Sequence, residues 1–377
     1  MASLEGRVHE LNERKVPMRF RVLQSGLPEA AMAAAIRRLE AAESCGSGAA
    51  KAAQWVDALC MLPIGKYACL PIGSGAPPDD VGRFLTGMRA RLDTAVYGHD
   101  EAKGQVLRLI AQWVINDRSK GLVLGVQGSP GVGKTELCRA VCEQLGLPFG
   151  FVPLGGANDG CYLVGHSYTY EGAVWGKVAD VLMKSRCMNP VLFFDELDKI
   201  SDSRHGEEVT NVLIHLTDPT QNDRFNDKFF MDIDLDLSKC LVIFSYNDEA
   251  RISPVLRDRM MRVVTQPYTV GDKLRIAGDH LLPAVLHEFA LPTGAVRIAD
   301  DVMRSIIELV EEEHGVRNLR RAIHDIVSHF NYDRLTTACD CPDIRMITRE
   351  DADRSIRSGR RDGPGSISKA SYMSMYC

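Results

Sequence analysis

The stretch from residue 121 to residue 141 constrains the fold of this chain more than any other. It opens on an apolar run of leucine and valine, which predicts a buried parallel strand. A glycine-rich turn follows, and a helical pattern begins at Lys134-Thr135. Glycines allow backbone amides to curl around a phosphate, and the helix N-terminus adds a partial positive charge. A strand, such a turn and a helix, in this order, form the context that a phosphate-binding P-loop requires.

The P-loop predicts a site for a nucleoside triphosphate, ATP, together with Mg²⁺. Lys134 would neutralise the β- and γ-phosphates, and the Thr135 hydroxyl would ligate Mg²⁺. A glycine-rich turn that arose by chance is disfavoured, because the strand and the helix are both in place. The residues that we expect to contact the nucleotide are Gly128, Ser129, Pro130, Gly131, Val132, Gly133, Lys134, Thr135 and Glu136.

A second apolar run, residues 190–194, ends in the carboxylates Asp195 and Glu196. This pattern is typical of a Walker B strand. We expect Asp195 to hold Mg²⁺ through water and Glu196 to orient and polarise the attacking water. The alternative interpretation is a strand that ends in a solvated acidic turn.

Two further features follow along the chain. The apolar run 240–246 ends in Asn247, whose amide could position the attacking water; a polar turn residue is the alternative. Arg257, Arg259 and Arg262 stand just before a short fifth apolar strand. An arginine in such a place often supplies positive charge to a neighbouring subunit's nucleotide, although a solvated surface position would explain any one of the three.

Composition and charge limit the classes of function that remain open to the chain. The 377 residues carry a net charge of −5, which argues against a strongly basic nucleic-acid surface. No run of 18 uncharged apolar residues appears and the N-terminus lacks a signal-peptide pattern, so we expect a cytoplasmic chain with no membrane partner. The eleven cysteines have no repeated spacing and are expected to be free thiols rather than a zinc site.

Strands that alternate with helices predict an α/β fold with a parallel sheet covered on both faces. Lys134, Asp195 and Asn247 would then converge at the carboxyl ends of its strands. A helix is expected over 172–188. The expected parts of the chain are a flexible arm at 1–19, a helical segment at 20–93, an α/β nucleotide-binding domain at 94–268, a helical lid at 269–336 and a disordered tail at 337–377.

Taken together, these motifs resemble those of the AAA+ ATPases, and in detail the ATPase module of Lon proteases. The resemblance runs from roughly residue 25 to residue 335. The segments that carry it are Gly165-His-Ser-Tyr-Thr-Tyr-Glu-Gly172, Asn189-Pro-Val-Leu-Phe-Phe-Asp-Glu-Leu-Asp-Lys199, Leu216-Thr-Asp-Pro-Thr-Gln-Asn222, Asp227-Lys-Phe-Phe230, His280-Leu-Leu-Pro283 and Gly315-Val-Arg-Asn-Leu319. The fold that this resemblance implies is a P-loop AAA+ parallel-sheet domain with a C-terminal α-helical lid and an N-terminal helical segment.

The resemblance also implies roles for single residues. Asn247 corresponds to sensor 1, Arg259 to the arginine finger and Arg317 to sensor 2. Tyr97 and Gly98 match the start of the family's ATPase domain and are expected beside the nucleotide. Asn247, Arg259 and Arg317 would serve ATP hydrolysis together with Lys134 and Glu196.

Other positions depart from the family. Tyr170 matches the pore-loop aromatic that grips an unfolded polypeptide, but Glu171 stands where the family has an apolar partner, and Trp175 replaces another neighbour. The family's large N-terminal domain is expected to be absent or reduced to the first twenty or so residues, and its peptidase domain is expected to be absent. Ser366 and Lys369 faintly echo the peptidase dyad, without a folded domain around them to hold base and nucleophile in reach.

The function expected from the sequence is an ATP-driven homo-oligomeric ring, a hexamer, that unfolds or remodels polypeptides, with any peptidase supplied by another chain. Two alternatives stay open. One is a nucleic-acid-associated ATPase of the clamp-loader or helicase type, which Arg357, Arg360 and Arg361 favour and the net charge disfavours. The other is an ATP-binding scaffold without turnover, which would not need residues that act on the attacking water.

Overall fold

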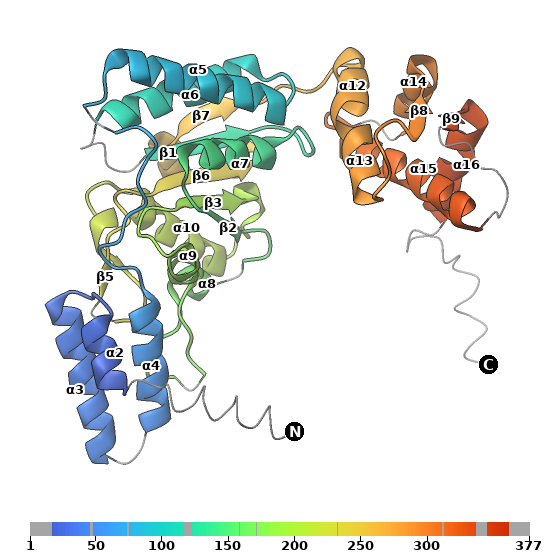
Figure 1. The fold of residues 1–377 in the computed structure, drawn as a ribbon. Helices are drawn as coiled ribbons and strands as arrows, with labels where there is room; N and C mark the ends of the chain where they lie inside the picture. The colour runs from blue at the N-terminus through green and yellow to red at the C-terminus, as the bar shows by residue number, and fades with distance from the viewer. Residues whose placement is uncertain are drawn as a thin grey trace, which may run out of the picture. The chain divides into compact units, whose positions relative to one another are not determined.

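The computed structural model describes residues 17–45, 48–73, 75–116, 122–157, 159–170, 172–231, 233–310, 313–336 and 345–361 (Figure 1). The chain divides into two compact units. The first contains the described residues up to 95 together with 100–127 and 134–264. The second contains 96–99, 128–133 and the residues from 265 onward. The P-loop glycines therefore belong to the second unit, whereas Lys134 belongs to the first.

A five-stranded parallel sheet organises the first unit, with the strand order β2-β3-β6-β1-β7. Its central strands are apolar and buried, as expected of a parallel sheet covered on both faces. The predicted α/β class is confirmed. The strands are β2 (Phe149–Pro153), β3 (Val191–Asp195), β6 (Leu241–Tyr246), β1 (Leu122–Gln127) and β7 (Met261–Val264).

Helices cover this sheet (Figure 1). Short 3₁₀ turns and a two-stranded ladder of β4 (Phe225–Asn226) and β5 (Asp234–Leu235) complete this part. The helices are α5 (Pro78–Ala95), α6 (Asp100–Ile115), α7 (Lys134–Leu145), α8 (Cys161–Val164), α9 (Lys177–Ser185), α10 (Arg204–Thr217) and α11 (Pro254–Arg259).

The helix predicted over 172–188 is shorter than expected, because it spans only Lys177–Ser185. Gly172 adopts a left-handed backbone with φ of 73°. The N–H of Gly176 donates to the buried carboxylate of Asp227 at 2.8 Å, which fixes the chain just before the helix. A distant buried acid thus sets the helix start.

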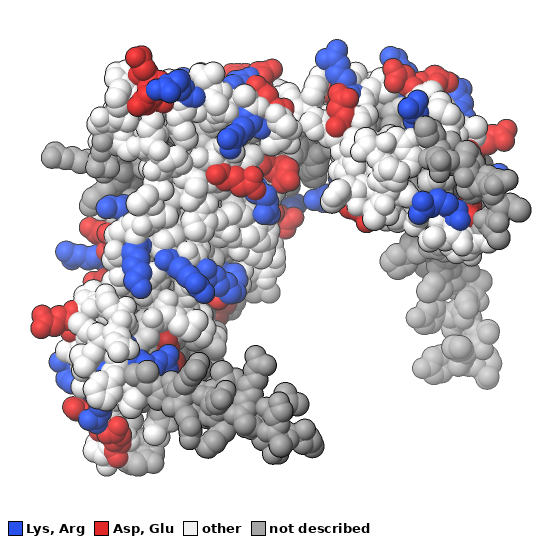
Figure 2. Space-filling view, viewed as in Figure 1, with Lys and Arg blue, Asp and Glu red and all other residues white. Residues whose placement is uncertain are grey.

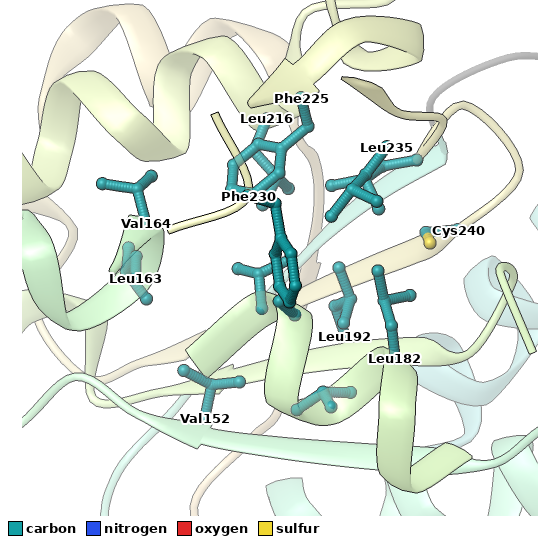
Figure 3. Packing of buried hydrophobic residues seen from close by; sticks show 14 of the residues in the cluster. Val152, Leu163, Val164, Leu182, Leu192, Leu216, Phe225, Phe230, Leu235 and Cys240 are labelled. Carbon is teal, nitrogen blue, oxygen red and sulfur yellow. The ribbon is translucent and has the colours of Figure 1, made fainter. Parts of the chain in front are cut away.

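Aromatic and aliphatic side chains fill the core beside the sheet. Phe194 and Phe244, on neighbouring strands, stack with ring centroids 5.3 Å apart. Phe230 is fully buried and lies in the middle of the side chains drawn in Figure 3. Burial of this apolar surface is the main stabilising contribution in a domain of this size.

Three N-terminal helices pack against the same unit: α2 (Met18–Gln24), α3 (Glu29–Cys45) and α4 (Ala49–Met61). Trp55 on α4 is 2% exposed, and its indole N–H donates to the Phe229 carbonyl at 2.8 Å. Its ring also lies 6.3 Å from that of Phe230. The helical segment therefore shares a core with the sheet domain.

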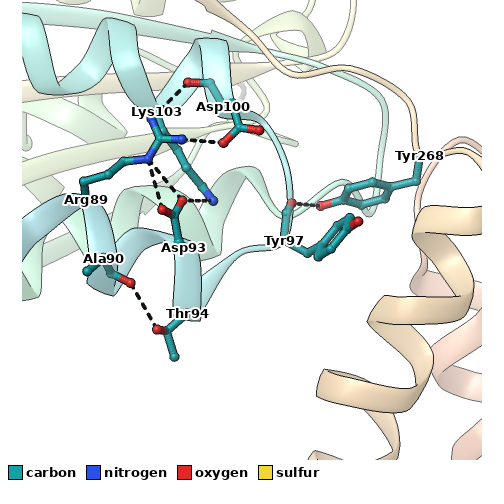
Figure 4. Close-up of polar contacts among 8 residues, drawn as sticks. All are labelled: Arg89, Ala90, Asp93, Thr94, Tyr97, Asp100, Lys103 and Tyr268. Atoms are coloured by element: carbon teal, nitrogen blue, oxygen red, sulfur yellow. Dashed lines mark hydrogen bonds and ion pairs between the residues drawn. The ribbon is translucent and has the colours of Figure 1, made fainter.

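A polar cluster joins α5 to α6 (Figure 4). Asp93 accepts hydrogen bonds from Arg89 and, at 2.8 Å, from the ammonium of Lys103, which is only 1% exposed. Burial would raise the pKa of Asp93, but the hydrogen bonds from Lys103 and Arg89 outweigh it and hold that pKa below its usual range. The contact between this carboxylate and the buried ammonium connects the two helices.

The second unit is mainly helical and has its own core, which includes Ala277, Val285, Ile306, Ile323 and Val327. A capping box at Thr269 and Asp272 starts its first helix. Its elements are α12 (Val270–Ile276), a π-helical turn (Ala277–Leu281), α13 (Leu282–Glu288), β8 (Val296–Ile298), α14 (Asp300–Leu309), α15 (Arg317–Thr336), β9 (Arg345–Ile347) and α16 (Arg349–Arg361).

The prediction of a disordered tail over 337–377 is wrong for residues 345–356, which are folded. Strand β9 pairs in parallel with β8, and the side chains of Ile347, Ala352 and Ile356 are buried in the core of this unit. Ala352 and Ile356 lie four residues apart on α16, which packs against α14 and α15, and Ile347 joins the same core from β9. Residues 337–344 and the pair Ser366 and Lys369 lie outside the described residues. Within the described ranges, no helix has the length and apolar content needed to cross a membrane.

Candidate nucleotide site

The carboxyl edge of the sheet brings together Lys134 and Asn247. Lys134 is the first residue of α7, and Asn247 follows the last residue of β6. The ammonium Nζ donates to the Asn247 side-chain Oδ1 at 2.7 Å. Because β1 and β6 are adjacent parallel strands, both side chains reach the same edge, as the sequence predicted.

The neighbouring strand β3 carries the predicted acidic pair to this edge. Asp195 ends β3, and its Oδ1 accepts hydrogen bonds from the Ser245 hydroxyl and, at 3.1 Å, from the N–H of Glu196. Ser245 is 1% exposed, and the preceding residues of β3 and β6 are directly paired. The strand register therefore orients the Asp195 carboxylate, through a serine that the sequence analysis did not single out.

Glu196 has an unusual backbone. Its φ of 60° and ψ of 47° lie in the left-handed region, which costs a residue with a Cβ about 1–2 kcal/mol. Its side chain lies against Gly155, where a Cβ would stand 2.1 Å from Glu196 Oε2. Glycine at 155 thus leaves the space that the carboxylate occupies. The left-handed backbone of Glu196 and the absence of a Cβ at Gly155 together determine the position of the Glu196 carboxylate.

In the second unit, the P-loop backbone is held from outside by two side chains that the sequence analysis missed. The carbonyl of Val132 accepts a hydrogen bond from His99 Nε2 at 2.9 Å, so this nitrogen carries the proton. The Tyr268 hydroxyl lies 3.0 Å from the same carbonyl and 3.3 Å from that of Tyr97. Burial, with the Asp272 charge, raises the pKa of Tyr268 to about 12, so it remains a donor at neutral pH.

Tyr97 and Gly98 are close to these side chains. Gly98 has a φ of 68°, and a Cβ there would lie 4.0 Å from the Tyr268 ring. The Tyr97 hydroxyl accepts from Arg275 at 3.3 Å. Figure 4 shows the Tyr268 hydroxyl directed at the Tyr97 carbonyl.

The P-loop also touches the start of α15. The N–H of Val316 donates to the Gly131 carbonyl at 3.1 Å. A Cβ on Gly315 would lie 2.4 Å from the backbone of both Pro130 and Gly131, and one on Gly131 would lie 3.1 Å from the Arg317 Cβ. The two backbones therefore approach as closely as glycine permits, and Arg317 is held next to the phosphate-binding turn.

The remaining P-loop positions differ in exposure. Gly128 is buried against Thr265, whereas Thr135 is half-buried at the first turn of α7. The exposed Glu136 carboxylate lies 3.8 Å from Arg139 Nε on the same helix. Glu136 therefore pairs locally, along α7.

Arg259, the predicted arginine finger, is bonded within its own chain. Its guanidinium donates to the Ile214 carbonyl at 2.6 Å and to Asp218 Oδ2 at 3.1 Å, both near the end of α10. The side chain is 28% exposed. The other two arginines of this stretch pair with one acid: Arg257 and Arg262 with Glu249.

Tyr170 is 67% exposed, at a turn in the segment between α8 and α9. Glu171 lies outside the described residues. Trp175, expected as a pore-loop neighbour, instead packs edge-on against Phe229 with ring centroids 5.8 Å apart. The tyrosine is presented to solvent, whereas the tryptophan belongs to the core.

Seven cysteines whose side chains the structure describes are free thiols: Cys60, Cys69, Cys138, Cys142, Cys161, Cys187 and Cys240. Burial raises the pKa of Cys142 to about 12 and also raises that of Cys138, so both inner-face thiols of α7 are protonated. In the described part of the chain, Asp159, Cys161 and His166 bring ligand atoms within 4.8 Å of one another. The ammonium of Lys228 lies 3.6 Å from the Cys161 sulfur and already supplies a positive charge there, so we assign no metal to this cluster.

Comparison with known proteins agrees with this geometry. Residues 124–268 match the model of the ATPase family associated with various cellular activities (AAA). The chain is 38% identical over 252 residues to a Lon protease homolog of Acanthamoeba polyphaga mimivirus, a match that covers 67% of this chain and 25% of the relative. It is 33% identical over 306 residues to Lon protease 4 of Sorangium cellulosum, which covers 81% and 37%.

A third relative is the Lon protease of Bacillus thuringiensis, 33% identical over 322 residues, or 85% of this chain and 38% of the relative. The chain thus spans between 25% and 38% of the length of these relatives. The matched regions include the P-loop, the acidic pair and the strand-end asparagine described above. The chain therefore carries an AAA+ ATPase module of the Lon type.

Proposed function

We propose that this chain uses ATP hydrolysis, in a homo-oligomeric ring, to unfold or remodel polypeptides. The observation that carries the catalytic part is the 2.7 Å bond between Lys134 Nζ and Asn247 Oδ1, beside the ordered carboxylate of Asp195. These groups lie at the carboxyl edge of a parallel sheet, where such folds bind ligands. The module's similarity to Lon proteases supports the polypeptide part.

In the proposed hydrolysis, the backbone N–H groups of the P-loop between Gly128 and Gly133, to which Pro130 contributes none, and the Lys134 ammonium bind the phosphates. Glu196 orients the attacking water and accepts its proton, while Asn247 holds that water in line with the γ-phosphate. Arg317, at the start of α15, senses the phosphate charge. Arg259 would exchange its bonds to α10 for the nucleotide of a neighbouring subunit and stabilise the transition state there.

The side-chain oxygens of Asp195 and Thr135 suit Mg²⁺, which prefers oxygen ligands. The two hydrogen bonds that reach Asp195 both end on Oδ1, which leaves Oδ2 as an acceptor within the described structure. With the Thr135 hydroxyl, it would hold the ion, directly or through water. Bound Mg²⁺ neutralises charge that develops on the β- and γ-phosphates.

We further propose a hexameric ring, with a nucleotide-binding domain at 94–268 and a lid at 269–336 that relays nucleotide state to the loop of Tyr170. The exposed tyrosine would grip the polypeptide. The unfolding step does not depend on whether a peptidase domain of the same or of a separate chain receives the product. Figure 2 shows acidic and basic side chains on both units on the drawn face, which gives the DNA-dependent alternative no particular support.

The test is steady-state ATPase turnover with and without casein, and with single- or double-stranded DNA. We expect casein to stimulate turnover and Glu196→Gln to bind ATP without hydrolysis. Tyr170→Ala should remove the stimulation but keep basal turnover, whereas Tyr332→Ala, at a tyrosine that is 66% exposed on α15, should change neither. Stimulation by DNA alone would replace the proposal with a nucleic-acid-dependent ATPase, and no turnover in a confirmed oligomer would leave an ATP-binding scaffold.

A further inference from the structure

The segment that carries Tyr170 is closed at its base. The N–H of Gly176 donates to Asp227 Oδ2 at 2.8 Å, and a Cβ on Gly165 would lie 2.8 Å from the Gly176 nitrogen. Just inside this pair, the N–H of His166 donates to the Val174 carbonyl at 3.1 Å. The two ends of the segment are therefore joined, and the described residues 165–170 and 172–176 are here called the tyrosine loop.

The tip of the tyrosine loop is held by a side chain from the N-terminal helices. Lys51, on α4, donates from Nζ to the Tyr170 carbonyl at 2.9 Å and to the Thr169 carbonyl at 3.3 Å. The same ammonium lies 4.9 Å from the centroid of the Tyr168 ring. Charge-assisted hydrogen bonds of this kind are stronger than those between neutral groups.

A second cation from these helices contacts the loop. The guanidinium of Arg38, on α3, lies 4.2 Å from the ring centroids of both Trp55 and Tyr168. It is thus placed between an aromatic ring of the helices and an aromatic ring of the loop. The Tyr168 ring also packs edge-on against Phe229, at 6.0 Å, which joins the contact to the buried core.

We propose that Lys51 and Arg38 are positioning residues that hold the tip of the tyrosine loop in place, so that the N-terminal helices fix the position of Tyr170. The proposal rests on the proposed function for the role of that tyrosine. Both cations bind the backbone or the neighbouring ring and leave the Tyr170 side chain 67% exposed. The loop tip is therefore fixed while its aromatic group remains available to a polypeptide.

The contact between Lys51 and the Tyr170 carbonyl joins two segments that are far apart in the sequence. Lys51 reaches across 119 residues to the Tyr170 carbonyl, which also accepts the N–H of Ala173 at 3.4 Å. A loop held by so few hydrogen bonds opens locally at small free-energy cost. Loss of the ammonium should therefore loosen the tip without unfolding the base, which Asp227 secures independently.

The test is amide hydrogen exchange of residues 167–170 and 172–174 in the full chain, without any polypeptide present. Lys51→Met should speed exchange in this loop by about fivefold to tenfold. Lys51→Arg, which keeps a cation able to donate to both carbonyls, should restore slow exchange. Lys66→Met, at an exposed lysine after α4, is the matched control and should change nothing.

Casein-stimulated ATPase gives the second readout. Lys51→Met should raise the casein concentration at half-maximal stimulation by about fivefold while basal kcat stays the same. Unchanged exchange in both Lys51→Met and Arg38→Leu would overturn the proposal. If Lys51→Met speeds exchange while Tyr170→Ala leaves stimulation intact, the positioning role of Lys51 is supported and the role proposed for Tyr170 is contradicted.

Discussion

The buried acid Asp227 makes the stability of the first unit depend on pH in an unusual direction. Its side chain is fully buried and accepts the N–H groups of Gly176 at 2.8 Å and Phe229 at 2.9 Å. Burial raises its pKa to about 6, against an ordinary value of 3.8, although the backbone hydrogen bonds act in the opposite sense. The folded state therefore binds a proton between pH 4 and pH 6 that the unfolded state has released.

The direction of the pH dependence follows from this difference in proton binding between the folded and unfolded states. Because the pKa is raised on folding, the stabilisation is fully present below about pH 4 and is lost as pH rises through about 6. At 1.36 kcal/mol per pKa unit, the loss is about 3 kcal/mol. An asparagine cannot ionise, so the free energy of unfolding of Asp227→Asn should lack this term.

Urea unfolding of both proteins between pH 4 and pH 7, followed by tryptophan fluorescence and by far-UV circular dichroism, measures this contribution. The wild type should lose about 3 kcal/mol relative to Asp227→Asn over this range. Asp202→Asn, at an exposed acid, should follow the wild type. A wild type that keeps pace with the asparagine variant, or gains on it as pH rises, would show that the hydrogen bonds outweigh burial and refute the reasoning.

Two further predictions concern the core and the catalytic edge. Phe230→Ala, which empties a fully buried site, should cost about 3–5 kcal/mol in urea unfolding, whereas Phe20→Ala, at a ring that is 58% exposed, should cost less than about 1 kcal/mol; similar losses would mean that the aromatic core collapses without cost. Gly155→Ala should displace the Glu196 carboxylate, lowering ATPase kcat by about tenfold to a hundredfold with nucleotide affinity unchanged. Gly82→Ala, on an open helical face, is its control, and equal kcat in the two variants would contradict the assigned position of Glu196.

The parallel sheet and the meeting of Lys134 with Asn247 could be predicted from the sequence. Long apolar runs that end in polar residues leave few alternatives to buried parallel strands, whose carboxyl ends must share an edge. The same pattern placed Asp195 there. Ser245 could also have been found, because it lies on β6 two residues before Asn247, but a single buried serine forms no recognisable sequence pattern.

Other features could not be predicted, because distant residues decide them. The start of α9 depends on Asp227, which is 51 residues beyond Gly176. His99 binds a backbone carbonyl of the P-loop, and a carbonyl leaves no mark on the sequence. The folded part of the predicted tail lies in a charged stretch, and its apolar residues acquire meaning only against α14 and α15.

The glycine-to-glycine contact between the P-loop and the start of α15 has a mechanical consequence. Helix α15 has 20 residues and is therefore about 30 Å long. Its first turn is registered on the Gly131 backbone by a hydrogen bond and by the absence of side-chain atoms at Gly315. A tilt of about 10° at that fulcrum would carry the far end of the helix through about 5 Å. A small change in the P-loop backbone at this contact would therefore be amplified along α15.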